Sequence, residues 1–205
     1  MISRAQGKTW TAGVAAGKQQ KLSALEKAML KWAVVDPEDR LLDASISSGM
    51  MAEYLRRNMQ CEVCGVSDNM ENVRAARSRL QNCDIVYSPA GDIPWREDSF
   101  DTILMRVSTE EPEQLSRMFA EAHRVLKPGG QLILGAPCYP AWINAVLNWF
   151  AAEEKQLLNR CCLERLLRQE KLNNVSWQRT GIGLGVMIAW KPKPSVLEVL
   201  EDTME

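Results

Sequence analysis

The chain has 205 residues, of which 46% are hydrophobic and 25% charged, with a formal net charge of −1. This length suits one well-buried domain, and the balanced charge gives no reason to expect a nucleic-acid partner. No apolar run reaches the roughly 18 residues that span a membrane, so no membrane association is expected. The opening MISRAQGKTW lacks the apolar segment of a secretory signal. We therefore expect a cytoplasmic protein whose six cysteines are reduced.

A helical segment is predicted before position 36. Its apolar face carries Leu22, Leu25, Met29 and Trp32. Six basic residues but one acidic residue fall between positions 4 and 31, which fits either a solvated helix face or a basic arm folding over a ligand site. Residues 1–35 are assigned as an N-terminal helical segment of the same domain.

From position 40 onward, strands and helices alternate with short connections. The expected strands are LLDA, CEVCGV, DIVY, FDTILMRV and QLILGAP. Helices are expected to begin near positions 50, 69 and 112, the second with Met70 on its inward face. The motif KPGG provides a glycine that would cap the third helix in a left-handed conformation. Such βα repeats predict a mostly parallel sheet covered on both faces, with ligands beyond the carboxyl ends of its strands.

The last third of the chain has a different pattern. Apolar residues between Trp142 and Phe150 surround much of one predicted helix, and a second helix is expected over Gln156–Glu170. The strands VSWQRT and GVMIAWK flank a glycine-rich turn and predict an antiparallel hairpin. The fold class is therefore a Rossmann-like, doubly wound α/β sheet with a C-terminal antiparallel hairpin. Residues 36–193 form this domain, and residues 194–205 form an acidic tail.

A CxxC motif at Cys61 and Cys64 raises the question of a metal site. The motif falls on a predicted strand, where residues three apart point to opposite faces. There is no second CxxC, and His123 is the only histidine. We therefore predict buried structural thiols and no metal.

The order of elements resembles the class I S-adenosylmethionine-dependent methyltransferases over roughly Ala33–Lys193. The stretches FDTILMRV and EAHRVLKPGGQLILGAP are similar to that family's signature, and IPWREDSFD is similar to its LPFPDGSFD segment. The resemblance is to the type 11 branch of the family. It implies a Rossmann-like fold, S-adenosylmethionine as cofactor and a small molecule as methyl acceptor.

The family's first cofactor loop has the pattern D-x-G-x-G-x-G after the first strand. Here the matching residues are Asp43, Ser45, Ser47 and Gly49, so serine stands at two glycine positions. In the family this loop packs against the methionine portion and ribose of the cofactor. A serine forced to positive φ would cost about 1–2 kcal/mol at each site, and its β-carbon and hydroxyl would occupy space beside the ligand.

Two further cofactor contacts are also altered. The family's ribose-binding acid matches Ser67, with Asp68 one residue later as a substitute. The acid that meets the adenine amino group matches Pro89 in one alignment and Asp92 in a gapped one, and both remain open. Together with the loop residues, these positions form the expected cofactor site.

Arg106 is the remaining cofactor-site candidate. It would neutralise the carboxylate of the cofactor or pair with a neighbouring glutamate on the surface. Other strand-end candidates on the substrate side are Ser108, Thr109, Glu110, Cys138 and Tyr139. No catalytic residue is assigned, because methyl transfer needs mainly alignment of the two reactants.

Two functions follow from these observations. One is a methyltransferase acting on a small molecule; the alternative is a non-catalytic protein of the same fold that serves as a binding or regulatory module. The helix around Trp142–Phe150 would line an acceptor pocket, form a homodimer or protein-partner interface, or pack in the core. An open cavity near Ser45 and Ser67 would favour the enzyme. A space filled by Met50, Met70 or Trp95 would favour the module.

Overall fold

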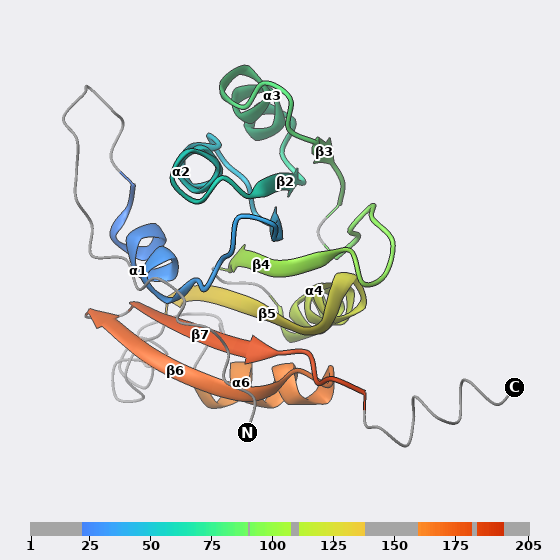
Figure 1. The fold of residues 1–205 in the computed structure, drawn as a ribbon. Helices are drawn as coiled ribbons and strands as arrows, with labels where there is room; N and C mark the ends of the chain where they lie inside the picture. The colour runs from blue at the N-terminus through green and yellow to red at the C-terminus, as the bar shows by residue number, and fades with distance from the viewer. Residues whose placement is uncertain (1–21, 90, 108–110, 138–159, 182–183, 195–205) are drawn as a thin grey trace, which may run out of the picture.

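The computed structural model describes residues 22–89, 91–107, 111–137, 160–181 and 184–194 (Figure 1). Its seven strands form one sheet in the order β3-β2-β1-β4-β5-β7-β6. They are β1 (Arg40–Asp43), β2 (Glu62–Ser67), β3 (Ile85–Tyr87), β4 (Phe100–Arg106), β5 (Leu126–Pro137), β6 (Asn173–Gly181) and β7 (Leu184–Trp190). The first five strands pair in parallel, whereas β7 is antiparallel to both β5 and β6. The predicted fold class is confirmed.

Helices cover both faces of this sheet (Figure 1). They are α1 (Ala24–Trp32), α2 (Met50–Met59), α3 (Met70–Arg79), α4 (Pro112–Val125) and α6 (Arg160–Gln169). The first three pack on one face and the last two on the other. The predicted helix around Trp142–Phe150 and the acidic tail lie outside the described residues. Within the described part of the chain, no helix has the length and apolar character needed to cross a bilayer.

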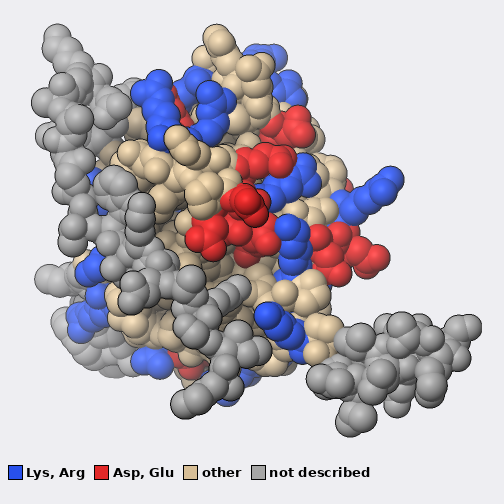
Figure 2. Space-filling model, in the orientation of Figure 1, with Lys and Arg blue, Asp and Glu red and all other residues tan. Residues whose placement is uncertain are grey.

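Lys and Arg side chains gather over α2 and α3 (Figure 2). The arginines of these helices are Arg56, Arg57, Arg74, Arg77 and Arg79. Arg56 donates to the carbonyl of Gln81, and Arg77 donates through two nitrogens to the carbonyl of Ile85. These two arginines of the cluster therefore fasten the turn and strand that follow α3.

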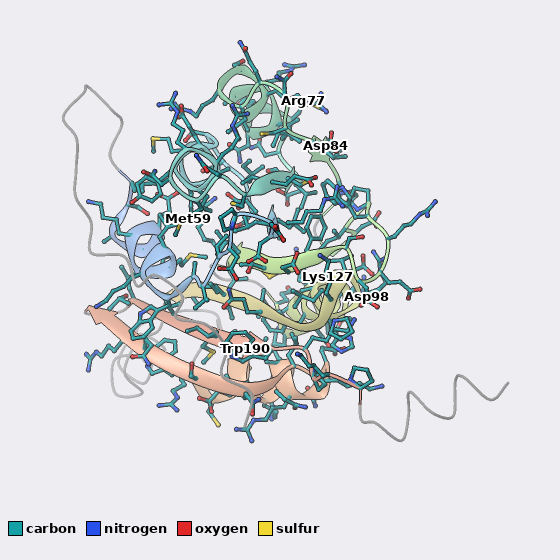
Figure 3. The ribbon with its side chains drawn as sticks, viewed as in Figure 1. Met59, Arg77, Asp84, Asp98, Lys127 and Trp190 are labelled. Atoms are coloured by element: carbon teal, nitrogen blue, oxygen red, sulfur yellow. The ribbon has the colours of Figure 1, made fainter. Side chains whose placement is uncertain are left out.

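The point where the strand order reverses lies between β1 and β4. From β1 the chain runs outward to β2 and β3, then returns to β4 on the other side of β1. Loops that leave the carboxyl ends of β1 and β4 therefore diverge, and such a point opens a crevice in α/β sheets. Asp98 and Lys127 in Figure 3 mark the opposite edge, before β4 and at the start of β5.

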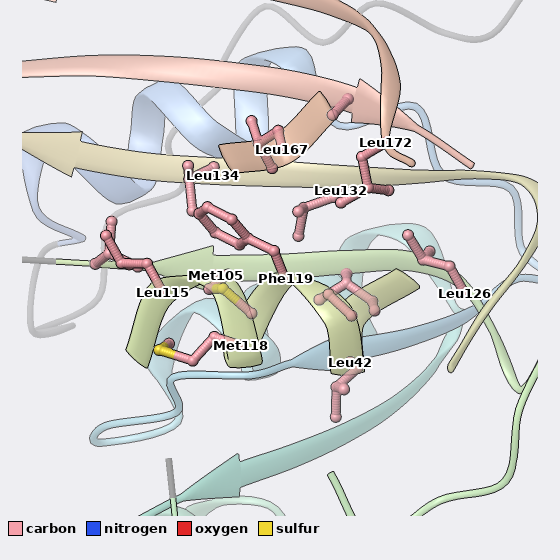
Figure 4. Close-up of a cluster of buried hydrophobic side chains, with 14 of the residues drawn as sticks. Leu42, Met105, Leu115, Met118, Phe119, Leu126, Leu132, Leu134, Leu167 and Leu172 are labelled. Carbon is pink, nitrogen blue, oxygen red and sulfur yellow. The ribbon is translucent and has the colours of Figure 1, made fainter. Parts of the chain in front are cut away.

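The apolar core has one layer on each face of the sheet. On one face, Phe119 of α4 lies among leucines of β5 and α6, as Figure 4 shows. Cys64 belongs to that layer, whereas Cys61 belongs to the layer under α1, α2 and α3, so their predicted opposite orientation is confirmed. Burial raises the pKa of both thiols to about 11, which keeps them protonated at neutral pH.

Two local expectations are wrong. Met70 is 43% exposed, because it is the first residue of α3 and the buried face of that helix starts with Val73. The KPGG motif does not cap α4, which ends at Val125 and has Leu126, in an extended conformation, as its C-cap. Its glycines instead pair with Lys191: the Gly129 N–H donates to the Lys191 carbonyl, and the Lys191 N–H donates to the Gly130 carbonyl.

The position of α1 depends on Gly135 in β5. A β-carbon at this glycine would lie 2.5 Å from the sulfur of Met29 and 3.2 Å from Leu25, both on α1. Met29 is fully buried, so the helix rests directly on the backbone of the sheet. This close contact fixes the distance between α1 and the carboxyl ends of the strands.

Replacing Gly135 by valine should destabilise the protein by about 1–3 kcal/mol, because the added side chain overlaps α1. Urea denaturation would measure the loss. The double variant Gly135→Val, Met29→Ala should lose less stability than the sum of the two single losses, because Met29→Ala removes the atom in closest conflict with the valine. Equal stability of wild type and Gly135→Val would contradict this account of the packing.

Candidate functional site

A cavity of about 150 Å³ lies where the chain leaves the carboxyl ends of β1, β2, β3 and β4. Polar groups on its wall come from five of the positions singled out in the sequence together with Asn72 and Ser88. The five are Ser45, Ser67, Asp68, Asp92 and Arg106. Residues up to 61 positions apart in the chain, Ser45 and Arg106, thus meet at the predicted edge of the sheet.

Ser45 extends the pairing of β1 with β4 beyond the end of β1. The N–H of Ala44 donates to the carbonyl of Leu104, as in a regular parallel ladder. Two residues further along β4, the N–H of Arg106 donates to the hydroxyl oxygen of Ser45 at 2.8 Å. A side chain therefore satisfies a strand N–H at the point where the loop turns away, which a glycine cannot do.

Neither Ser45 nor Ser47 has the positive φ that would strain a serine. Gly49 is the only residue of this loop with positive φ, at 75°, whereas Ser45 and Ser47 have ordinary backbone angles. Gly49 is also the N-cap of α2, and a β-carbon there would lie 3.2 Å from the backbone of Ala76. The loop thus retains glycine at the position where both conformation and space require it.

Arg106 spans this loop and reaches α1. Its Nη1 donates to Oε1 of Glu26 at 3.0 Å, and Nη2 donates to the carbonyl of Ser45 and to Oγ of Ser47, the latter at 3.3 Å. Its Nε is 3.3 Å from Oγ of Ser45. The glutamate that pairs with Arg106 is therefore not a neighbour on the surface. Glu26 lies 80 residues earlier in the chain and is only 5% exposed.

Asp43 lies behind the loop and not on the cavity wall. The side chain is buried, and Oδ1 accepts from the N–H of Ser45 at 3.2 Å. Burial raises the pKa of Asp43 to about 6, against the opposing effects of the Arg106 charge and the Ser45 hydrogen bond. Asp43 thus holds Ser45, and Ser45 in turn contacts Arg106.

Both residues at the end of β2 line the cavity. Ser67 is buried and its hydroxyl accepts from the N–H of Asn69, whereas the following Asp68 is exposed. The cavity wall therefore includes a carboxyl residue one position later than in the family pattern. Adjacent residues contribute to one wall because the chain turns between β2 and α3.

The alternatives Pro89 and Asp92 also share one wall. The N–H of Asp92 donates to the carbonyl of Pro89 at 3.1 Å, and Gly91 between them has φ of 84°. This turn brings both candidates to the cavity, and of the two only Asp92 has a side-chain carboxylate.

Met50, Met70 and Trp95, the three side chains considered as possible fillers of the site, do not line the cavity. Met70 is exposed, and Trp95 packs edge-on against Phe100 in the core, with ring centroids 5.5 Å apart. Met50 starts α2 and is also absent from the wall. The enclosed volume is nevertheless below the roughly 300–1,000 Å³ typical of small-molecule pockets.

Glu26 is the functional candidate that the sequence analysis missed. The motif Ser23-x-x-Glu26 is a capping box, in which Glu26 accepts from the Ser23 N–H and Ser23 accepts from the Glu26 N–H. That pattern predicts the start of a helix and contains no sign of Arg106. The candidates Ser108, Thr109, Glu110, Cys138 and Tyr139 lie outside the described residues.

The Ser45→Ala substitution should lower the free energy of unfolding by about 1–3 kcal/mol, because it removes the acceptor of the Arg106 N–H. Ser47→Ala is the matched control and should cost less, because Ser47 contacts only the Arg106 side chain. Chemical denaturation of both variants measures the difference. A larger loss for Ser47→Ala would contradict the role given to Ser45.

Asp43→Asn should change how stability depends on pH. Because the folded pKa exceeds the ordinary 3.8, the carboxyl group contributes stability below about pH 4 that is lost as pH rises through about 6. A shift of two pKa units corresponds to about 3 kcal/mol. Urea denaturation from pH 4 to 8 should show a flatter profile for Asp43→Asn, with Asp68→Asn as an exposed control. Parallel profiles for Asp43→Asn and wild type would contradict this reading.

A family profile described as a methyltransferase domain matches residues 42–134. Over 97 residues the chain is 32% identical to phthiotriol/phenolphthiotriol dimycocerosates methyltransferase 1 of Mycobacterium ulcerans, covering 46% of this chain and 36% of the relative. Over 111 residues it is 28% identical to the demethylmenaquinone methyltransferase of Chlorobaculum tepidum, a match that covers 54% of this chain and 45% of the relative. The chain spans less than half the length of these two curated relatives.

Solved structures share the fold at lower identity. The complex between the Haloferax volcanii Trm112 methyltransferase activator and its methyltransferase gives a TM-score of 0.69 at 16% identity, covering 84% of this chain and 90% of that one. Human N-acetylserotonin methyltransferase in complex with S-adenosylmethionine gives a TM-score of 0.66 at 14% identity. The match covers 82% of this chain and 52% of that one. The sequence match is to a methyltransferase domain over residues 42–134, and the fold is the one that these solved methyltransferase structures share, so the chain is similar to class I S-adenosylmethionine-dependent methyltransferases.

Proposed function

We propose that this protein binds S-adenosylmethionine in the cavity at the carboxyl ends of β1–β4 and transfers its methyl group to a small molecule. The observation that carries the proposal is the meeting of Arg106, Asp68 and Asp92 on one wall at the point where the strand order reverses. Support for an enzyme over a non-catalytic module comes from the curated relatives, which are methyltransferases by name.

In this proposal, each polar group on the cavity wall contacts a different part of the cofactor. The Asp68 carboxylate, beside the Ser67 hydroxyl, would accept hydrogen bonds from the ribose hydroxyls. Asp92 would accept from the adenine amino group. Ser45, Arg106 and the backbone after β1 would hold the amino-acid end, while Asp43, Ser47 and Gly49 maintain the shape of the loop.

When bound, the cofactor supplies an electrophilic methyl group on a sulfonium centre. The chain's own residues would then orient this group and exclude water from it, because alignment is the main requirement of methyl transfer. The buried Met105 and Met118 contribute apolar surface to the same wall. An apolar wall beside the charged groups suits a ligand that has both a sulfonium and an aromatic base.

The proposal predicts calorimetric binding of S-adenosylmethionine and S-adenosylhomocysteine with micromolar dissociation constants. Asp68→Asn should weaken binding about tenfold, because it removes a charged acceptor from the ribose. Asp84→Asn is the matched control and should bind as wild type, because Asp84 precedes β3 at the opposite edge (Figure 3). Absence of heat and of a thermal shift with millimolar ligand would overturn the proposal and favour the non-catalytic module.

A further inference from the structure

The Glu26 carboxylate is fully engaged, although it belongs to a helix outside the βα repeats. Oε2 accepts from the N–H of Ser23 at 2.8 Å, and Oε1 accepts from Nη1 of Arg106 at 3.0 Å. Its side chain is 7% exposed, against 22% for Arg106. The ion pair between Glu26 and Arg106 is thus mostly removed from water, and Arg106 is the more exposed of the two residues.

Arg106 has little remaining capacity to bind a second carboxylate. A guanidinium carries five N–H donors, and each of its three nitrogens here already donates to the protein. A ligand carboxylate binds arginine best through two parallel N–H groups. Such a contact is blocked while Glu26 and Ser47 hold the outer nitrogens.

Arg106 also contributes to the wall of the cavity. Arg106 lines the cavity and also contacts Ser45 and Ser47, so its guanidinium lies along the loop after β1. A ligand whose amino-acid end packs against this loop must therefore meet Arg106 first. Glu26 holds the guanidinium there from the side of α1.

We propose that Glu26 occupies on Arg106 the place that the carboxylate of the ligand takes, and thereby lowers the affinity of the site for ligands with an amino-acid end. This inference rests on the proposed function. Binding exchanges one carboxylate for another: Nη1 of Arg106 leaves Oε1 of Glu26 and donates to the ligand. Glu26 is then an affinity-determining residue that acts through Arg106, and its contact with Ser23 is unchanged.

The test is calorimetry with two ligands on Glu26→Gln. Glutamine preserves the size of the side chain and, through its one amide oxygen, the capping bond to Ser23, but its NH2 group cannot accept from Arg106 and carries no charge. S-adenosylhomocysteine carries the amino-acid end, and 5′-methylthioadenosine is the nucleoside thioether that lacks it. We expect Glu26→Gln to bind the former about tenfold more tightly and the latter within about twofold of wild type.

Glu53→Gln is the matched control, because Glu53 also pairs with arginines on a helix but does not line the cavity. It should change neither affinity. Glu26→Asp draws the carboxylate back by one methylene and should give a smaller gain in the same direction. This variant decides the question if circular dichroism shows Glu26→Gln to be unfolded.

The outcomes separate the two proposals. Unchanged or weaker binding of S-adenosylhomocysteine by Glu26→Gln, with wild-type binding intact, overturns the exchange; a loss identifies Glu26 as a partner of the ligand's ammonium group. An equal gain for both ligands also overturns it, because the effect is then independent of the carboxylate. Absence of binding by wild type and variants alike overturns the proposed function itself.

Discussion

The candidate site is organised by the contacts of one guanidinium group. Arg106 connects the end of β4 to the loop after β1 and to α1, three segments that are separate in the chain. A partly buried cation requires compensating charge and hydrogen bonds, and here Glu26 supplies the charge while the two serines supply acceptors. The buried Asp43 adds negative charge from behind the loop. The shape of the cavity follows from these requirements.

The fold was largely predictable because its determinants are local and periodic. Alternating apolar strands and amphipathic helices identified β1 through α4 and the terminal hairpin. The parallel arrangement, in turn, identified the edge where Ser45, Ser67 and Asp68 meet. Local patterns failed where a helix terminus mattered, since neither the exposure of Met70 nor the extended end of α4 has a periodic signature.

The chemistry of the site was less predictable, because it depends on contacts between distant residues. Substituting serine for glycine suggested strain, yet whether Ser45 has positive φ depends on how β4 continues beside it. Glu26 was readable as a capping residue, but its pairing with Arg106 requires knowing that α1 lies on Gly135. The alternatives Pro89 and Asp92 could not be separated from the sequence, because a tight turn brings both to the same wall.

The hydroxyl of Ser45 limits which residues position 45 can accept. Reversion to the family's glycine at this position would leave the N–H of Arg106 without its acceptor, and would also remove the oxygen beside Nε. The first of these contacts is made by the backbone of position 106 and would be lost with any side chain there, whereas the second depends on the arginine itself. The requirement for a hydroxyl at position 45 is therefore set mainly by the backbone of β4 and would remain if the arginine were replaced.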